Sequence, residues 1–255
     1  MKLIFLLQKT KLLMISICLF VWNCNLSDLR NPAFPIQESN QKKAKDIISE
    51  IQNPKDSKVS IRGKDIWDSS FIRLFTPVSE NDQKYRAWLD LSTGDLDLEL
   101  MGKESKTFKK RNNISFEITD DGKEIQASGL TSIYLESFSL YIRLPFIISK
   151  FPILSYLGTQ KIDQQEYDLI FVSESENQPS KNSDQYVVYL DKQDKRIKFI
   201  QFTYREVSKS YIGFLEYRGE TEVNGVSMPR EIYIRESLGS KDFVHKIEIS
   251  RLARE

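Results

Sequence analysis

The sequence predicts a mainly β protein with a few helices, an α+β chain organised as one antiparallel meander of about ten strands. Short alternating or aromatic-rich runs recur from Ser57 to Ile249, and turn residues separate them. The pattern breaks once, over Ser132–Tyr156, where an apolar stretch with few charges predicts helical structure. A meander of this length is expected to curl or close, because exposed strand edges invite unwanted pairing.

Residues 1–23 are interpreted as an export signal. Three lysines precede the uncharged run Leu12–Trp22, which is shorter than the roughly 20 residues that a membrane-spanning helix needs. A basic segment followed by a short apolar one is typical of a removable signal. The run ends in Val21-Trp22-Asn23-Cys24, which resembles a bacterial lipobox, although Trp22 and Asn23 are bulkier than the usual residues. The signal therefore ends at a cysteine that is expected to carry a lipid.

The cysteine content favours lipidation at Cys24. The chain has two cysteines, and Cys18 would be removed with the signal. A single cysteine left in an exported chain needs an explanation, and a thioether-linked lipid supplies one. The alternatives are a cleaved signal with an incidental cysteine and an uncleaved membrane anchor. Two or three acyl chains would hold the protein stably on a membrane, whereas one chain is marginal.

The mature chain would hold 232 of the 255 residues, enough for one domain with a sizeable core. We divide it into a polar tether at 24–38, which contains Pro32 and Pro35, and a single domain at 39–255. Without the signal, 34 basic residues face 36 acidic ones. This balance gives no electrostatic footprint for nucleic acid.

The domain is expected to begin with a helix over Ser39–Gln52. Ser39 can cap it, and apolar residues recur at helical spacing behind it. Asn53-Pro54 ends it, because a residue before proline avoids the helical conformation. The apolar stripe consists of Ala44, Ile47, Ile48 and Ile51.

The first half of the domain then predicts paired strands. In Asp95–Leu100, carboxylates alternate with leucines, as in a strand with one buried face. Asp121-Gly122 separates two further runs and predicts a tight hairpin, because both central positions of that turn favour positive φ. The predicted strands here are Val59–Ile61, Ile66–Phe75, Lys84–Leu91, Asp95–Leu100, Ile114–Ile118 and Glu124–Ala127.

The last third of the chain repeats this pattern. The charged turn Asp191–Lys195 and the Asn224-Gly225 pair each separate two strand-like runs, so each predicts a hairpin. The predicted strands here are Glu166–Val172, Tyr186–Leu190, Ile197–Tyr204, Tyr211–Tyr217, Glu220–Val223, Val226–Ile234 and Phe243–Ile249.

The apolar segment Ser132–Tyr156 must bury itself between these two groups of strands. Leu135–Leu144 has helical spacing, and Pro145 and Pro152 are expected to break the helix into pieces. Two placements fit the pattern: a movable lid in the open mouth of a curled sheet, and an ordinary core helix packed on one sheet face. The sequence leaves both open.

Taken together, these parts resemble the LolA/LolB-like superfamily of bacterial lipoprotein carriers and receptors. The resemblance runs from Ser39 to Arg251 and rests on the order of the elements and on three late segments, Tyr186–Asp191, Leu215–Arg218 and Val223–Pro229. It implies an unclosed antiparallel half-barrel whose concave apolar face is plugged by helices and binds acyl chains. A lipid-anchored member resembles the receptor type, or related lipid-binding lipoproteins, more than the soluble carrier.

The sequence offers no catalytic or metal-binding constellation. Its one histidine, His245, lies on the same predicted strand face as Phe243 and Ile247, where a packed, hydrogen-bonded role is expected, since a catalytic triad also needs a placed nucleophile and acid. Zinc-type Cys/His spacing and phosphate-binding glycine loops are absent. The carboxylates of Asp95–Glu99 could suggest calcium, but alternation along a strand is more typical of a solvated face. We read the glycosylation sequon Asn113-Ile114-Ser115 as chance.

We therefore predict a non-enzymatic, exported protein, lipid-anchored to a bacterial membrane, most simply the outer membrane. It would shelter an apolar ligand, such as the acyl chains of a lipid or lipoprotein, and need no cofactor beyond the lipid at Cys24. The predicted lining residues are Phe138, Tyr141, Phe146, Phe199 and Tyr211; each could equally be an ordinary core aromatic. The alternative is a surface lipoprotein that binds a protein partner and whose barrel interior is a filled core. An enzyme is the third hypothesis.

Overall fold

The computed structural model describes residues 26–51, 58–68, 77–174, 178–223 and 226–254. Thirteen strands form one antiparallel sheet, and two further strands, β12 and β13, form a separate ribbon. The strands are β1 (Lys58–Trp67), β2 (Asp82–Asp90), β3 (Leu96–Met101), β4 (Lys106–Arg111), β5 (Ile114–Ile118), β6 (Glu124–Gln126), β7 (Ile153–Ile162), β8 (Gln165–Ser173), β9 (Gln185–Asp191), β10 (Ile197–Thr203), β11 (Ile212–Arg218), β12 (Thr221–Val223), β13 (Val226–Met228), β14 (Glu231–Arg235) and β15 (His245–Arg254).

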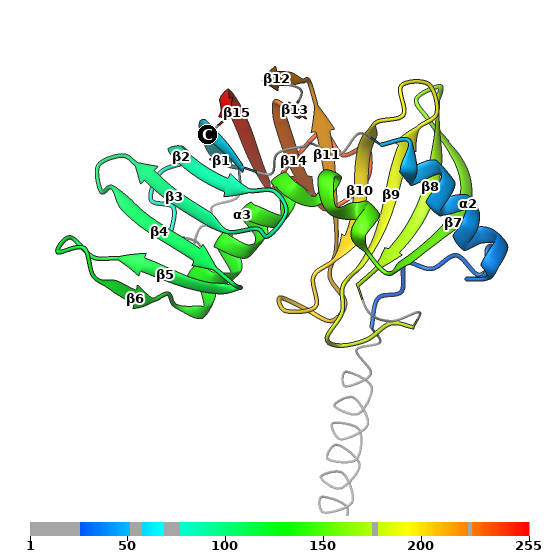
Figure 1. Ribbon diagram of the computed structural model, residues 1–255, viewed down its shortest axis with the longest axis horizontal. Helices are drawn as coiled ribbons and strands as arrows, with labels where there is room; N and C mark the ends of the chain where they lie inside the picture. The colour runs from blue at the N-terminus through cyan, green and yellow to red at the C-terminus, as the bar shows by residue number, and fades with distance from the viewer. Residues whose placement is uncertain (1–25, 52–57, 69–76, 175–177, 224–225, 255) are drawn as a thin grey trace, which may run out of the picture.

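The sheet is open and strongly curved, and it does not close into a barrel (Figure 1). Its strand order is β6-β5-β4-β3-β2-β1-β15-β14-β11-β10-β9-β8-β7. The first and last strands of the domain, β1 and β15, therefore pair in the middle and join an N-terminal meander to a C-terminal one. The predicted α+β fold with an antiparallel half-barrel is confirmed, with more strands than the sequence predicted.

Strand β3 shows why the local predictions succeed. Leu96, Leu98 and Leu100 are buried, and the residues between them are half-exposed. Asp97 pairs with Arg111 in β4, and Glu99 lies 3.2 Å from Arg86 in β2. The predicted hairpin at Asp121-Gly122 joins β5 to β6, but only Gly122 has a positive φ, of +79°, so the tight turn with two positive φ angles does not form. The predicted Asn224-Gly225 turn lies outside the described residues, between the paired strands β12 and β13.

The N-terminal helix α2 (Glu38–Ser49) packs on β7 (Figure 1) through Ala44 and Ile48. The predicted cap at Ser39 is wrong: the N-cap residue is Gln37, and no side chain caps the helix. Ser39 lies inside the first turn, because the N-cap lies two residues earlier than the polar pattern indicated.

The apolar segment forms helix α3 (Gly129–Ile147), which continues into the short 3-10 helix η2 (Ile148–Lys150). Two predictions for this segment are corrected. Pro145 does not end the helix, and the segment's end from Ile153 onward belongs to β7. The helix tolerates Pro145 because the carbonyl of Tyr141, which a residue with an N–H at position 145 would bond, accepts a hydrogen bond of 3.1 Å from the Tyr217 hydroxyl.

The sheet buries side chains on both of its faces in the C-terminal half. The main core fills the concave face, together with α3. A second cluster lies on the convex face of β7–β10, and Leu29, Phe34 and Ile36 of the N-terminal segment cover it. The sequence predicted a polar tether for 24–38. Residues 26–37 instead pack against the domain, because Leu29, Phe34 and Ile36 contact the convex-face cluster.

Cys24 and the whole predicted signal at 1–23 lie outside the described residues. In the part of the chain that the structure describes, neither helix combines the length and the apolar character needed to cross a bilayer.

Candidate functional site

Helix α3 crosses the concave face of the sheet and plugs it (Figure 1). Ser128 caps its N-terminus by accepting a hydrogen bond from the Thr131 amide. The helix buries eight side chains over its length, which explains why its sequence has little amphipathic character. These are Tyr134, Leu135, Phe138, Ser139, Tyr141, Ile142, Leu144 and Ile147.

Buried polar contacts fix the N-terminal half and the middle of α3 to the sheet. The Tyr134 hydroxyl donates to Asp65 in β1 at 2.7 Å, and the Ser139 hydroxyl donates to the Gly94 carbonyl at 3.0 Å. Lys110 in β4 is only 1% exposed and reaches Glu136 of the helix at 2.7 Å. A buried lysine requires such a partner, because burial of an unpaired charge is very costly.

Asp65 is the centre of a buried polar cluster. Its carboxylate is fully buried on the concave face and accepts hydrogen bonds from Tyr134, from Trp67 Nε1 at 3.1 Å and from His245 Nε2. The His245 ring stacks on the Trp67 ring with centroids 3.9 Å apart. His245 is thus a packed, hydrogen-bonded residue, as predicted, and its cluster ties the central β1–β15 pair to α3.

Five tyrosines of this core have pKa values that are raised by burial. Burial raises the pKa of Tyr85, Tyr134, Tyr141, Tyr186 and Tyr217 well above the ordinary tyrosine value. A raised folded-state pKa of an acid stabilises the fold below its unfolded-state pKa of about 10, and this stabilisation is lost as the pH rises further.

We therefore expect alkaline unfolding above about pH 10, with these tyrosines ionising in the same transition. Tyrosinate absorbance and near-ultraviolet circular dichroism, followed together through the titration, check this. Ionisation of all eleven tyrosines with the dichroism intact would contradict it.

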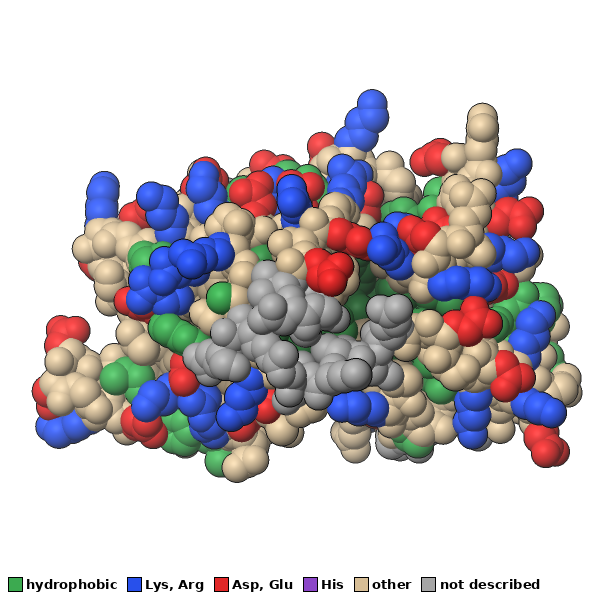
Figure 2. All heavy atoms as spheres, turned by 45° about the horizontal axis from the view of Figure 1, so that its top comes forward, with side chains coloured by type: hydrophobic (Ala, Val, Ile, Leu, Met, Phe, Trp, Pro, Cys, Tyr) green, Lys and Arg blue, Asp and Glu red, His purple; other side chains and the backbone are tan. Residues whose placement is uncertain are grey.

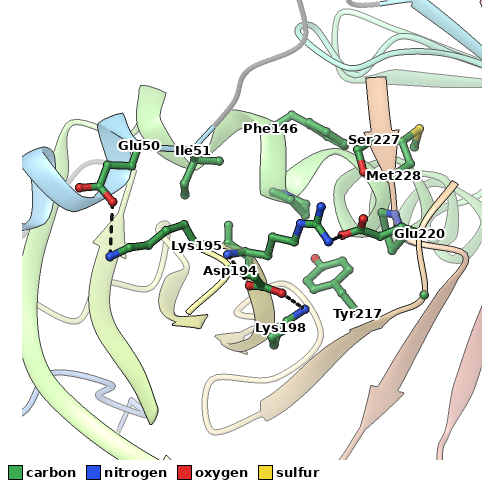
Figure 3. A pocket seen from close by; sticks show the side chains of 15 residues that line it. Glu50, Ile51, Phe146, Asp194, Lys195, Lys198, Tyr217, Glu220, Ser227 and Met228 are labelled. Carbon is green, nitrogen blue, oxygen red and sulfur yellow. Dashed lines mark hydrogen bonds and ion pairs between the residues drawn. The ribbon is translucent and has the colours of Figure 1, made fainter. Parts of the chain in front are cut away.

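A cavity of about 530 Å³ opens at the C-terminal end of α3 (Figure 3). Its volume lies within the range of small-molecule sites, about 300–1,000 Å³. Four parts of the chain form it: the end of α2, the Pro145-Phe146 turn of α3, the β9–β10 turn, and the β11–β14 connection. Its apolar lining is Ile51, Pro145, Phe146, Ile197, Tyr217, Met228 and Pro229.

Ion pairs surround this apolar lining. Lys195 lies 3.4 Å from Glu50 of α2, Arg196 lies 2.6 Å from Glu220, and Lys198 lies 2.7 Å from Asp194. Figure 3 shows the Lys195 side chain reaching toward Glu50 and the Lys198 side chain reaching toward Asp194. The partners are all partly exposed, so each pair contributes roughly 0–1 kcal/mol. The cavity therefore combines balanced charge with a group of apolar side chains, and its lining is mixed in polarity.

The surface around this end of the molecule is similarly balanced. The end that carries β12 and β13 is turned toward the viewer in Figure 2, and Lys/Arg and Asp/Glu side chains are interspersed across that face. Such a surface does not favour a ligand of one strong charge.

Of the five predicted lining residues, only Phe146 lines this cavity, whereas Phe138, Tyr141 and Tyr211 lie in or against the concave core. Phe138 and Tyr141 are buried in α3; Phe138 contacts Tyr85 edge-on at 5.0 Å, and Tyr141 packs on Phe202. Tyr211 continues this aromatic row, with its ring 6.0 Å from that of Phe202. Phe146 is half-buried and lines the cavity.

Phe199 does not lie with them. It belongs to the convex-face cluster, where its ring packs against Tyr167 and Tyr189 at centroid distances of 5.6 and 6.1 Å. Its neighbour Ile200 faces the concave core instead, because successive side chains in a strand point to opposite faces.

Most of the cavity lies outside the residues that the sequence predicted for the site. The turn Asp191–Lys195 was predicted only as a turn, yet residues 194–198 supply one side of the mouth. No local signal could have found these residues, since the cavity combines segments up to 179 positions apart, from Glu50 to Pro229.

Comparison with known proteins supports the fold. No protein-family model matches the chain, and no curated protein matches its sequence. Among solved structures, it is similar to a LolA superfamily protein from Nitrosomonas europaea, with a TM-score of 0.54 and 12% identity over 85% of this chain and 94% of that one. It is also similar to a DUF1329 family protein from Desulfovibrio piger, with a TM-score of 0.56 and 8% identity over 85% and 93%. The chain therefore has a LolA-like fold, as the sequence predicted.

Proposed function

We propose that this protein is a non-catalytic lipoprotein of the bacterial envelope that shelters an apolar ligand, namely acyl chains of a lipid or lipoprotein. Cys24 would carry the lipid anchor, and the outer membrane is the proposed location. The ligand would occupy the space between the C-terminal end of α3 and the curved sheet. The LolA-like fold supports this proposal, and the cavity at the end of the plug helix is the observation that carries it.

The lining of the cavity suits an amphiphile. Phe146, Ile197 and Met228 line the cavity and either belong to the concave core or pack against it; Ile197 and Met228 are buried, and Phe146 is half-buried. Each Å² of apolar ligand surface removed from water there contributes roughly 25 cal/mol to binding. The ion pairs at the mouth are weak and exposed, so a polar head group can compete for these charged partners at small cost.

The direct test is mass spectrometry of organic extracts from protein lacking residues 1–24, purified gently from a lipid-containing host. We expect a lipid at close to one molecule per chain. A clean blank from folded protein would contradict acyl-chain binding and would direct attention to protein partners.

A charge in the lining should abolish this binding. Phe146→Asp is expected to lower lipid occupancy by about tenfold or more, since a carboxylate facing an acyl chain loses its hydration without gaining a partner. Ser227→Trp, at an exposed position of the mouth, should lower it by filling the space without removing a core contact.

Ile114→Asp is the matched control, because Ile114 is 49% exposed on β5 and does not line the cavity. Lipid content and thermal unfolding are measured for all three variants. Equal lipid content in Phe146→Asp, Ser227→Trp and the control would place the ligand elsewhere.

A protein-interaction module with a filled core is the second candidate. The observation that favours it is the burial of α3, which leaves Phe138, Leu135 and Ile142 without exposed surface. Hydrogen exchange separates the two: amides of α3 that exchange faster than those of β9 favour a displaceable plug, and equal protection favours a fixed core.

A further inference from the structure

The N-terminal segment is fixed to one particular turn of the domain. The Ser27 amide donates to the Lys209 carbonyl at 3.1 Å, and the Ser27 hydroxyl donates to the Ser210 carbonyl at 2.8 Å. Arg205, which is 7% exposed, donates to the carbonyls of Ser27 and Lys209. The chain therefore enters the fold at the β10–β11 turn, residues 204–211.

Apolar contacts hold the residues that follow. Leu29 is buried, and its amide donates to the Gln185 side chain at 3.0 Å. Phe34 packs edge-on against Tyr156 at 6.2 Å. An ideal Cβ built on Gly158 would lie 2.6 Å from the Phe34 ring, so only glycine admits this contact. Release of the segment would expose the convex-face cluster, and we therefore treat residues 27–37 as part of the domain.

Little chain remains between this fixed point and the cysteine. Cys24 precedes Ser27 by three positions, and an extended chain spans at most about 3.6 Å per residue. A lipid on Cys24 must consequently enter its bilayer within roughly 10 Å of Ser27, close to the β10–β11 turn.

The cavity opens at the other end of the same strands. Strand β10 runs from Ile197, which lines the cavity, to Thr203, beside the β10–β11 turn. Six steps of about 3.3 Å separate these ends by roughly 20 Å. Strand β11 likewise starts at the β10–β11 turn and ends at the cavity, because Gly219 and Glu220, which follow its last residue, line the cavity.

We infer that the β10–β11 turn is the membrane-facing surface of the protein, and that the cavity opens away from the membrane that anchors the chain. The binding partner of the β10–β11 turn is the phospholipid bilayer. Residues 206–210 of the turn are exposed, and Val207, at 53%, is one of four exposed large hydrophobic side chains in the described part of the chain. Glu206 and Lys209 lie on either side of it with opposite charges, so this surface is assigned from Val207 and from the short connection to Cys24. This inference rests on the proposed anchoring at Cys24, and it implies that a ligand is received from the aqueous side.

The experiment uses full-length, lipidated protein reconstituted into phosphatidylethanolamine/phosphatidylglycerol vesicles that carry nitroxide on the lipid head group. An environment-sensitive fluorophore is attached in the variants Val207→Cys and Gln193→Cys. Gln193 is exposed in the β9–β10 turn, at the cavity end of the same strands, and does not line the cavity. Lipidation blocks the thiol of Cys24.

We expect the nitroxide to quench the label at position 207 several-fold more than the label at 193. Insertion of about 12 Gly/Ser residues between Asn25 and Leu26, which adds roughly 20 Å of reach, should remove most of this difference. Vesicle-bound protein with equal quenching at both positions, or with stronger quenching at 193, would overturn the orientation while leaving the anchor intact. Protein that does not float with the vesicles would overturn the anchor and the orientation together.

Discussion

Gly63→Ala is expected to destabilise the fold by about 3 kcal/mol or more, which corresponds to a fall in Tm of roughly 6–12 °C. Gly63 faces the concave side of β1, beside an irregularity in its pairing with β15. A Cβ at this position would lie 1.6 Å from the Glu248 carbonyl oxygen and 2.9 Å from the Tyr85 hydroxyl. The first of these neighbours is backbone, so the central strand pair would have to separate.

The missing side chain at Gly63 also leaves room for Tyr85, which is fully buried. Its hydroxyl passes over Gly63 and donates to the Glu248 carbonyl at 3.0 Å, which satisfies a backbone group that the bulge turns inward. Tyr85→Phe removes this hydrogen bond alone and is expected to cost about 1–3 kcal/mol.

Gly129→Ala is the matched control. Gly129 begins α3 and has no positive φ, and a Cβ added there would meet no atom of the described residues within 4 Å. Alanine should leave stability unchanged or raise it by up to about 1 kcal/mol, because it favours the helix. Urea unfolding of the three variants measures the differences. A Gly63→Ala protein as stable as Gly129→Ala would show that the bulge relaxes freely.

Local patterns predicted the strands, but they could not predict how the strands pair. The alternation in Asp95–Leu100 and the hairpin at Asp121-Gly122 depend on neighbouring residues, and the structure confirms both. The pairing of β1 with β15 joins residues nearly 200 positions apart. It depends on the absence of a side chain at Gly63, on the Tyr85 hydroxyl and on the irregularity in the β1–β15 pairing, and no short window of sequence contains all three.

The candidate site shows the same limit. Phe138 and Tyr141 could be predicted because their segment is apolar over its whole length, so burial follows wherever the helix lies. Phe199 could not be assigned to a face, because strand β10 is buried on both faces and Phe199 and Ile200 are both apolar. Its convex face is covered by Leu29, Phe34 and Ile36, which the sequence analysis had placed in a polar tether.

Asp65→Ala should be the most destabilising change of a polar residue, at about 3–5 kcal/mol. The substitution removes the common acceptor of three buried groups, which are Trp67 Nε1, the Tyr134 hydroxyl and His245 Nε2. Asp65→Asn keeps the shape but offers only one accepting oxygen, so a smaller loss is expected. Asp97→Ala is the control: Asp97 is paired but 36% exposed, and its loss should cost less than about 1 kcal/mol.

Denaturant unfolding gives these values, and a double-mutant cycle of Asp65→Asn with Tyr134→Phe isolates the contact between sheet and helix. We expect a coupling of about 0.5–3 kcal/mol, since the two side chains share one buried hydrogen bond. Additive effects would show that Asp65 stabilises the β1–β15 pair alone and does not hold the helix.

The position of this cluster bears on how a ligand could enter. Asp65 and Lys110 hold the N-terminal half of α3 and the Gly94 carbonyl holds Ser139 near its middle, whereas the cavity borders its C-terminal end at Pro145 and Phe146. If acyl chains displace the helix, the C-terminal end should move first and the polar cluster should limit how far the opening extends. Asp65→Asn would then raise lipid occupancy as well as hydrogen exchange along α3. Faster exchange without any gain in lipid would mean that the ligand needs only the cavity already present, with the helix as a fixed wall.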